Sequence, residues 1–577
     1  MKLQITKALF LFLIVFLAGQ GSGYAQDKSA KIDELMKLYH SYGQFNGAAL
    51  VAENGKVIYK KGLGLANMEW NIPNETDTRF RLGSITKQFT AALILQLVEQ
   101  GKIKLDGKIS SYLPDYRKDI GDKITVHHLL THTSGIPSYT SQPKFFEDVS
   151  RNPFVVADFV KKYASGDLEF EPGSKFSYNN SGYFLLGAII EKVTGKPYEQ
   201  VLEENILDPL GMKNTGYDHF DAVLSKRASG YNKTPKGYIN APYLDMSIPY
   251  AAGSLYSTVE DLYLWDRALY TDKLLSAKSK ELMFKPNLEN YGYGFSITNA
   301  SVGATKETIP VITHGGGING FNTTIVRLVG NQHLIVLLDN TSQGRNLDKI
   351  SKSITNILYN QPYSQPKKSI AEALFNTAAK QGAEAAVKQY RNLKVSQSAT
   401  YDFNEDELNT LGYQLISLKK IKEAIEIFKL NVEAYPQASN PYDSLGEAYM
   451  MSGDKELALK NYKRALELNP QNTNAASIIK LFESPAVTVK VYPKVYDQYV
   501  GEYQLAPNFI LTVTREGDKL MAQATGQSKI ELLPNSETQF FVKEVNAQVS
   551  FVKDEKGMVT ALILNQNGQK IEGKKIK

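Results

Sequence analysis

The stretch FRLGSITKQFTAALILQL, residues 80–97, contains a clear helical pattern and a candidate nucleophile. From Thr86 onward, apolar residues recur every three or four positions, which is typical of a helix, and Gly101 is a plausible end. Ser84 would lie at the start of this helix, where free N–H groups and the helix dipole favour developing negative charge. Lys87 follows three residues later, on the same face. A hydroxyl beside a neutral amine is an activated nucleophile, so Ser84 and Lys87 form a candidate catalytic pair.

The S-x-x-K spacing is a weak signal when it stands alone, because serine and lysine are both common residues. The alternative interpretation is a serine that caps the helix, followed by a solvated lysine. Further motifs later in the chain are needed to distinguish a catalytic pair from these structural roles.

Length and composition narrow the class of protein. At 577 residues the chain is too long for one core, and its length suggests roughly three or four domains. The net charge of +6 is spread along the chain without a long basic block, so no nucleic-acid-binding surface is indicated. Cysteine is absent, which excludes a lipobox cysteine, a disulfide framework and a thiolate metal site.

The N-terminus has the pattern of a signal peptide, predicted at residues 1–25. Lys2 and Lys7 precede an apolar run at residues 8–18, and small residues at 23–25 offer a cleavage point. The apolar run is short for a membrane span, although an uncleaved anchor is the alternative. We therefore expect a periplasmic or secreted bacterial protein that starts near Gln26 and keeps no stable membrane span.

Two stretches after residue 40 predict local structure. Residues 47–59 predict a hairpin, because two apolar runs flank an Asn-Gly turn. Residues 127–137 hold three histidines, which suggests a metal site, but no carboxylate is suitably spaced and H-E-x-x-H is missing. We therefore favour structural roles for these histidines, with His132 bonding backbone near the site.

A polar loop, FSYNNSGY at residues 176–183, opens a buried helix that ends at Gly195. Its Tyr178 and Asn180 would project a phenol and an amide into a cleft. The alternative is simple turn and capping chemistry, since asparagine favours both.

A glycine-rich stretch, ITHGGGINGF, occupies residues 312–321 and contains a formal G-x-G-x-x-G. The dinucleotide interpretation fails, because residues 321–328 are strand-like where that fingerprint needs a helix. We expect these glycines to lie on an edge strand, where they let a substrate backbone approach closely. A further strand at 334–338 predicts an antiparallel meander, and a helix at about 347–358 would close the domain.

Five motifs in this order resemble the penicillin-recognising serine hydrolase family, the branch of class C β-lactamases, D-alanyl-D-alanine carboxypeptidases and related esterases. They are S-x-x-K within 80–91, LLTHTSG at 129–135, Y-x-N at 178–180, GSLYSTVEDL at 253–262 and HGG at 314–316. The resemblance covers about residues 30–360. It implies an α/β domain, an antiparallel sheet covered by helices, beside a helical subdomain, with the site between them.

One motif departs from the lactamase pattern. His314-Gly315-Gly316 stands where the lactamases have Lys-Thr-Gly, which resembles some carboxypeptidases, aminopeptidases and esterases of the family. Efficient β-lactam hydrolysis is therefore not expected. A G-x-S-x-G elbow is also missing, which argues against an α/β-hydrolase.

The resemblance implies a role for each candidate catalytic residue. Ser84 would attack a carbonyl, and Lys87 and Tyr178 are the candidate bases, with Tyr178 returning the proton to the leaving group. A protonated or polar His314 would stand beside them. Free tyrosine and lysine have pKa values near ~10 and ~10.4, so neither is a base at neutral pH without help. Burial and nearby cations lower the pKa of a lysine, and nearby cations lower that of a tyrosine. The proton cannot be assigned within such a coupled cluster.

The same resemblance implies the residues that hold the substrate. The backbone N–H groups of Ser84 and Gly317 would form the oxyanion hole. Asn180, His314 and Gly316 would contact the substrate, with Asn180 holding its amide. His314 carries full charge only below a pKa near ~6.5, so recognition of a carboxylate would weaken as pH rises. No metal or organic cofactor is required.

The helical region at 369–483 contains a repeat. Leu411-Gly412 and Phe428 recur 34 residues later as Leu445-Gly446 and Tyr462, which resembles the tetratricopeptide pattern over about 405–472. The small residues would let paired helices touch, and helices within 371–393 would cap one end. The repeats could bind a protein partner in a groove, or could be a spacer packed on the hydrolase.

The rest of the predicted organisation follows from composition. Residues 26–360 form the hydrolase domain, and a proline-marked linker at 361–368 follows it. Short alternating runs at 484–577 predict a β-rich domain, a small barrel or half-barrel like those often appended to these hydrolases. The expected fold is thus multidomain: an α/β β-lactamase-like domain, helical repeats and an all-β domain.

The expected function is an exported serine hydrolase that forms an acyl-enzyme. Its substrates would be peptides of the D-amino-acid or peptidoglycan type, or esters. A β-lactamase proper is the first alternative, with the same mechanism and faster deacylation. The second alternative is a non-catalytic penicillin-binding or scaffold protein that recruits partners through its repeats.

Overall fold

The computed structural model describes residues 27–304, 308–483, 491, 493–506, 509–542, 547–554, 556–566 and 569–577. The predicted signal peptide lies outside these residues. The chain forms two compact units, which are described separately. The first reaches Ala373 and takes in Asn392–Phe403, and the second comprises Leu374–Arg391 and Asn404–Lys577.

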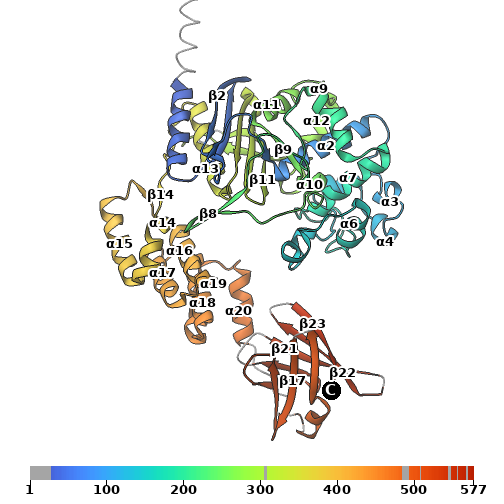
Figure 1. Ribbon diagram of the computed structural model, residues 1–577, viewed down its shortest axis with the longest axis vertical. Coiled ribbons are helices and arrows are strands. Elements are labelled where there is room, and N and C mark those ends of the chain that lie inside the picture. Colours follow the sequence, from blue (N-terminus) through green and yellow to red (C-terminus); the bar gives the residue numbers. More distant parts are fainter. Residues whose placement is uncertain are drawn as a thin grey trace, which may run out of the picture. The chain divides into compact units, whose positions relative to one another are not determined.

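An antiparallel six-stranded sheet forms the centre of the first unit, in the order β10-β11-β12-β13-β1-β2 (Figure 1). Its strands are β1 (Gly47–Glu53), β2 (Lys56–Leu63), β10 (Ser296–Ser301), β11 (Thr308–Ile318), β12 (Phe321–Leu328) and β13 (His333–Asp339). The predicted hairpin is confirmed: Asn54 and Gly55 join β1 to β2 with φ angles of 49° and 77°. The predicted meander is also confirmed, as β11, β12 and β13 pair in sequence.

Helices cover both faces of this sheet, because its strands alternate between two cores. Ala49 and Val51 face one core together with the helix at 27–41 and α13 (Gly344–Leu358). Ala48 and Leu50 face the other, which includes α2 (Thr86–Glu99) and α11 (Val259–Ala268). The resulting three layers are those expected for the α/β domain.

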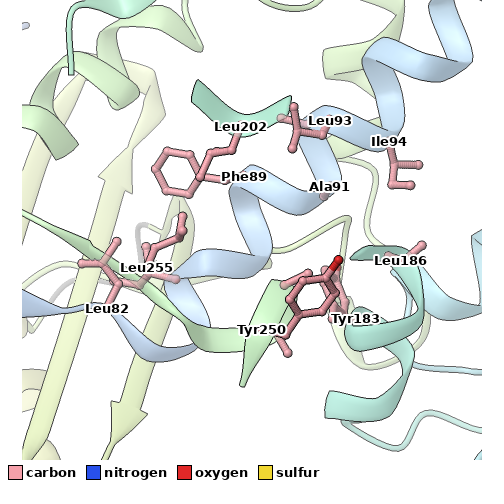
Figure 2. Close-up of a cluster of buried hydrophobic side chains, with 14 of the residues drawn as sticks. Leu82, Phe89, Ala91, Leu93, Ile94, Tyr183, Leu186, Leu202, Tyr250 and Leu255 are labelled. Atoms are coloured by element: carbon pink, nitrogen blue, oxygen red, sulfur yellow. The ribbon is translucent and has the colours of Figure 1, made fainter. Parts of the chain in front are cut away.

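Helix α2 lies deep in the second core. Phe89 stacks on Trp265 at 4.3 Å, and Leu93 and Ile94 pack in the same cluster as Leu186 (Figure 2). The helix begins at Thr86 and ends near Gly101, as predicted. Because the helix is buried on nearly every side, the residues at its start are held rigidly.

A helical subdomain and several short strands complete the first unit. Helix α7 (Asn180–Thr194) ends with Gly195 in the left-handed region, as predicted, and packs against α2 and α10 (Tyr250–Gly253). The other elements are α3 (Ile109–Tyr112), α4 (Lys118–Gly121), α5 (Val126–Leu130), α6 (Val156–Tyr163), α8 (Tyr198–Leu202), α9 (Asp208–Leu210), α12 (Ala277–Met283), β3 (Leu65–Asn67), β4 (Ile72–Pro73), β5 (Phe80–Arg81), β6 (Gly216–Tyr217), β7 (Tyr231–Thr234), β8 (Gly237–Asn240) and β9 (Leu255–Ser257).

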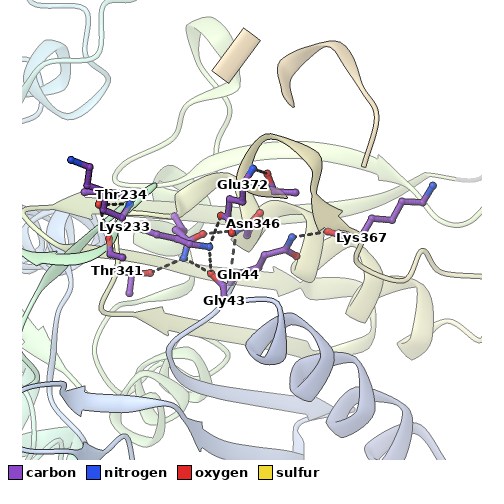
Figure 3. A network of polar contacts seen from close by, with 12 residues as sticks. Gly43, Gln44, Lys233, Thr234, Thr341, Asn346, Lys367 and Glu372 are labelled. Atoms are coloured by element: carbon purple, nitrogen blue, oxygen red, sulfur yellow. Dashed lines mark hydrogen bonds and ion pairs between the residues drawn. The ribbon is translucent and has the colours of Figure 1, made fainter. Parts of the chain in front are cut away.

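The segment expected to be a linker packs on the first unit. Gln44 donates to the carbonyl of Lys367, and Lys233 donates to the carbonyl of Gly43 and pairs with Glu372 at 2.6 Å (Figure 3). At the end of the segment, β14 (Lys368–Ser369) pairs in parallel with β15 (Tyr401–Asp402). Residues 361–373 are therefore fixed to the hydrolase rather than free.

The repeats form helical pairs in the second unit. Their helices are α16 (Glu405–Ser417), α17 (Ile421–Ala434), α18 (Ser439–Ser452), α19 (Lys455–Leu468) and α20 (Thr473–Glu483), and α14 (Ile370–Gln381) and α15 (Ala383–Ser396) precede them. A Cβ on Gly412 would lie 2.3 Å from the ring of Phe428, and one on Gly446 would lie 3.2 Å from Tyr462. These glycines therefore let paired helices touch, as predicted.

The C-terminal region is a closed barrel of eight antiparallel strands, which confirms the barrel of the two expected forms. The strands are β16 (Gly501–Ala506), β17 (Phe509–Glu516), β18 (Lys519–Ala524), β19 (Ile530–Pro534), β20 (Gln539–Val542), β21 (Ala547–Lys553), β22 (Val559–Gln566) and β23 (Gln569–Lys575). Tyr499 and Phe551 stack at 4.3 Å in its core. Among the described residues of the whole chain, none of the helices has the length and apolar character needed to span a membrane.

Candidate active site

Ser84 lies in a single 3-10 turn, Gly83–Ile85, directly before α2. The turn is fixed from both sides, because Leu82 donates to the carbonyl of Leu255 at 2.7 Å and Leu255 donates to the Thr86 hydroxyl. Its neighbours Gly83 and Ile85 are buried, whereas Ser84 is partly exposed. The serine hydroxyl is thus presented at the start of a rigid helix, where the sequence predicted it.

Lys87 is completely buried and directs its amine at Ser84. Its Nζ lies 3.0 Å from Ser84 Oγ, 2.8 Å from Asn180 Oδ1 and 2.8 Å from the Ala252 carbonyl. Desolvation lowers the pKa of Lys87 well below its ordinary value. A neutral amine can donate to Asn180 and Ala252 and accept a proton from Ser84, which is the arrangement a general base requires.

Tyr178 lies on the other side of this group. Lys87 Nζ is 4.9 Å from the centre of its ring, and the Ser84 side chain bonds to its hydroxyl. Desolvation raises the pKa of Tyr178, while the bond to Ser84 acts in the opposite direction. Because 40% of the side chain is exposed, the rise is smaller than for an enclosed phenol, but its direction keeps the hydroxyl protonated at neutral pH.

The loop that carries Tyr178 is held by its neighbours. Asn179 caps α7 by accepting from Gly182 N at 2.8 Å, and its own N–H donates to His132 Nδ1 at 3.0 Å. The His132 ring lies 4.3 Å from that of Tyr178. His132 therefore bonds backbone beside the site, as expected from the sequence.

The two other histidines of this stretch also bond within the fold. His127 Nδ1 bonds to the Tyr293 hydroxyl at 2.8 Å, and His128 forms a capping box with Thr125. Among the residues that the structure describes, no group of three or more His, Cys, Asp or Glu could hold a metal ion.

The glycine-rich strand approaches the Ser84 turn closely. A Cβ on Gly316 would lie 1.9 Å from the Leu82 carbonyl oxygen, and one on Gly83 would lie 3.0 Å from the Gly317 nitrogen. Gly317 has open space on its own Cβ side, with Asn322 Oδ1 at 3.9 Å the nearest atom. The backbone of Gly317 is thus placed next to Ser84, where an oxyanion-hole donor would have to be.

The expectation of an edge strand was wrong as stated. The glycines lie on β11, which is the second strand of the sheet, between β10 and β12. However, β10 pairs only with residues 308–313, so residues 314–318 have no neighbour on that side among the described strands. The open edge is local, because the pairing between β10 and β11 stops at Thr313, just before the glycines.

His314 is neutral and engaged through both ring nitrogens. Its Nε2 accepts from the Tyr291 hydroxyl at 2.8 Å, and its Nδ1 donates to the Gly315 carbonyl at 2.6 Å. Burial lowers the pKa of His314 to about 4. Of the two expected forms, the polar histidine agrees with this geometry, and the protonated one does not at neutral pH.

A cavity of about 450 Å³ opens beside Ser84. Its wall includes Ser84 and Asn180 as well as Gly317 from the sheet. Asn180 is fixed there, since its Nδ2 donates to Thr140 Oγ1 at 3.1 Å while its Oδ1 accepts from Lys87. The cavity therefore lies between the α/β part and the helical subdomain, as the resemblance implied.

Three participants were not predicted from the sequence: the Ala252 carbonyl, Thr140 and Tyr291. A backbone carbonyl leaves no side-chain signal, and Ala252 directly precedes the quoted motif at 253–262. Tyr291 belongs to a Tyr-Gly-Tyr-Gly stretch whose spacing says nothing about His314. Each acts on a residue far away in the chain, so only tertiary structure could identify it.

Comparisons with known proteins agree with this geometry. Residues 29–357 match the family model described as Beta-lactamase, residues 444–472 match Tetratricopeptide repeat, and residues 486–575 match Domain of unknown function (DUF3471). A penicillin-binding protein of Bacillus subtilis (strain 168) is 25% identical over 581 residues, which cover 95% of this chain and 100% of that protein.

Two further relatives match the hydrolase region. A putative penicillin-binding protein, PbpX, of Bacillus subtilis (strain 168) is 31% identical over 334 residues, covering 58% of this chain and 79% of that protein. A teichoic acid D-alanine hydrolase of Staphylococcus aureus is 29% identical over 346 residues, covering 58% of this chain and 80% of that protein.

Proposed function

Since the chain belongs to the beta-lactamase family of hydrolases, we propose that it acts through an acyl-enzyme on Ser84, with peptides of the D-amino-acid type or esters as substrates. The observation that carries this proposal is the buried amine of Lys87. It has no ion-pair partner among the described residues and lies 3.0 Å from the Ser84 hydroxyl. An amine held in this way is poised to accept the proton of the nucleophile.

In the first step, Lys87 takes the proton of Ser84 while Ser84 Oγ attacks the substrate carbonyl. Negative charge develops on the carbonyl oxygen, beside the backbone N–H groups of Ser84 and Gly317. One such donor typically contributes ~2.7–4 kcal/mol to the stability of the transition state. The positive end of α2 points toward the same place and adds to this effect.

In the second step, Tyr178 donates a proton to the leaving group, because its pKa is raised and it remains protonated. The resulting acyl-enzyme is hydrolysed by water, with proton transfers in the reverse direction. This division of roles assigns the base, which the sequence left open between Lys87 and Tyr178, to Lys87 and keeps Tyr178 as the acid. The names of the relatives, a D-alanine hydrolase among them, support substrates that contain D-amino-acid acyl groups.

The test is covalent labelling of the nucleophile. A fluorophosphonate probe should label the protein, and the label should disappear in Ser84→Ala. Ser41→Ala, an exposed serine whose hydroxyl bonds only to its own helix, is the matched control and should label normally. Equal labelling of Ser84→Ala and the control would contradict the proposal and favour the scaffold alternative.

Turnover of a β-lactam distinguishes a peptidase or esterase from a β-lactamase proper. A β-lactamase proper releases its acyl group quickly, whereas a peptidase or esterase of this type accumulates the penicilloyl adduct. Intact-mass measurement during turnover distinguishes them. We expect the adduct to persist.

Export remains a proposal from the sequence, supported by the pattern at residues 1–25. The mass of the protein recovered from the periplasm or medium should correspond to a start near Gln26. A binding partner for the repeats is likewise a proposal, with a packed spacer as the alternative.

A further inference from the structure

The cavity beside Ser84 is lined without a Lys, Arg, Asp or Glu, as far as the described part of the chain extends. Side-chain amides form its polar wall, and Phe146, Leu244 and Ile248 contribute an apolar wall. The amides belong to Asn180, Asn232, Asn319 and Asn322. The lining also includes the hydroxyl side chains of Thr140 and Ser342. Amides and hydroxyls both donate and accept hydrogen bonds, so this wall suits neutral carbonyl and N–H groups of a substrate.

The basic residues close to the cavity already have partners. The amine of Lys87 is bonded to Ser84, Asn180 and the Ala252 carbonyl, and His314 is neutral with both nitrogens engaged. Lys233 follows Asn232 in the chain, but its amine binds Glu372 and the Gly43 carbonyl (Figure 3). None of these three side chains is therefore free to neutralise a substrate carboxylate.

A charged group that enters such a cavity loses water and gains no counter-ion. In proteins, an unpaired buried charge is costly enough to exclude one ligand in favour of a neutral isostere. Resting on the hydrolase function proposed above, we propose that this site selects esters and amides that carry no charge beside the scissile bond. Carboxylate-bearing peptides and β-lactams would then be poor substrates, as would substrates with an ammonium group at that place. Among the D-amino-acid substrates proposed above, the inference therefore favours those whose α-amine is acylated and whose α-carboxyl is an amide or ester.

The test uses three esters of phenylacetylglycine that differ only in the leaving group. The leaving groups are 3-hydroxybenzamide, 3-hydroxybenzoate and 3-(aminomethyl)phenol, which are neutral, anionic and cationic at pH 7. The kcat/KM of the full-length protein for each ester is divided by the rate of hydroxide hydrolysis, which removes intrinsic reactivity. We expect the neutral ester to be preferred by about 10-fold or more over both charged ones.

A normalised preference for the carboxylate or the ammonium ester, or equal values for all three, would overturn the inference. Intact-mass detection of the acyl-enzyme keeps this outcome separate from failure of the proposed function. If Ser84 is acylated by all three esters at equal rates, the hydrolase proposal stands and the inference about charge selectivity is wrong. If none of them acylates Ser84, both proposals fall.

A substitution in the cavity lining tests whether the absence of charge there causes the selectivity. Asn232→Lys places a cation in the lining and should raise the ratio of carboxylate to carboxamide turnover about 10-fold. Asn232→Gln changes size but not charge and should leave that ratio within about twofold of the wild-type value. An unchanged ratio in Asn232→Lys, with the protein folded, would remove the cavity wall as the source of selectivity.

Discussion

Lys87 and Tyr178 flank the Ser84 hydroxyl, and burial moves their pKa values in opposite directions. Desolvation disfavours the charged form of each group, so it lowers the pKa of the amine and raises that of the phenol. As pH falls through the lowered pKa of Lys87, the base becomes charged and is lost. As pH rises through the raised pKa of Tyr178, the acid is lost. A profile of kcat/KM against pH should therefore show an acidic limb from Lys87 and an alkaline limb from Tyr178, with a plateau between them.

Removing the Tyr178 hydroxyl tests its role in proton transfer. Tyr178→Phe keeps the ring that packs against His132 and deletes only the acid. General acid–base groups typically contribute ~10²–10⁴-fold in rate, so kcat for an amide or poor-leaving-group ester should fall in that range. A p-nitrophenyl ester, whose leaving group needs no proton, is the control and should lose less in its acylation rate. A loss below about threefold for the amide would indicate that Tyr178 only packs.

The neutral state of His314 makes a prediction that differs from the expectation from sequence alone. An unperturbed histidine would titrate near ~6.5, so carboxylate recognition would weaken through neutral pH. Burial lowers the pKa of His314 to about 4, so the ring is charged only below that pH. The profile of kcat/KM between pH 5.5 and 8.5 should then be the same for a neutral ester and for a β-lactam. A fall in kcat/KM for the β-lactam alone as pH rises through about 6.5 would contradict this.

At the scale of elements, the site depends on how closely β11 approaches the turn before α2. Gly316→Ala would place a Cβ 1.9 Å from the backbone oxygen of Leu82 and 2.3 Å from Thr323 Oγ1. The strand must move, which should cost about 1–3 kcal/mol in free energy of unfolding and displace the Gly317 N–H from the oxyanion site.

Gly315→Ala is the matched control for this clash, because its Cβ would lie 3.7 Å from the nearest atom, the Thr323 carbonyl oxygen. Urea unfolding and kcat should change much more in Gly316→Ala than in Gly315→Ala. Similar effects of the two substitutions would show that the contact between β11 and the turn is not what fixes the site.

For the whole molecule, the boundary of the hydrolase lies further along the chain than the motifs indicate. All catalytic motifs precede residue 361, but Lys367 and Glu372 bond to Gln44 and Lys233, and β15 pairs with β14. Asn232, beside Lys233, lines the cavity. These contacts connect the segment after residue 361 to the wall of the site.

Two shortened chains test this boundary. Residues 26–403 retain the whole first unit and should hydrolyse a small ester with near-native kcat. Residues 26–361 lose the Lys233–Glu372 pair and should unfold at a lower urea concentration, with KM rising more than kcat falls. Equal stability and KM for both chains would show that the segment at 362–403 is a free linker after all. Collapse of activity in a folded 26–403 chain would instead show that the second unit shapes the site.

Much of this protein could be determined from the sequence because many of its signals are local. The Asn54-Gly55 turn, the start of α2 at Thr86, the end of α7 at Gly195 and the 34-residue repeat all depend on residues close in the chain. Backbone conformation and apolar period determine such features within one or two turns. The order of the motifs also placed Ser84, Lys87, Tyr178 and Asn180 at one site, where the structure has them.

Properties that depend on burial and on contacts between distant residues could be determined only from the tertiary structure. A pKa follows from how much protein surrounds a group, so the neutral state of His314 and the opposite shifts of Lys87 and Tyr178 had no sequence signal. Tyr291 and the Ala252 carbonyl reach the site from other elements. The place of β11 inside the sheet and the uncharged wall of the cavity arise from strand order and loop packing, because these bring together residues separated by hundreds of positions.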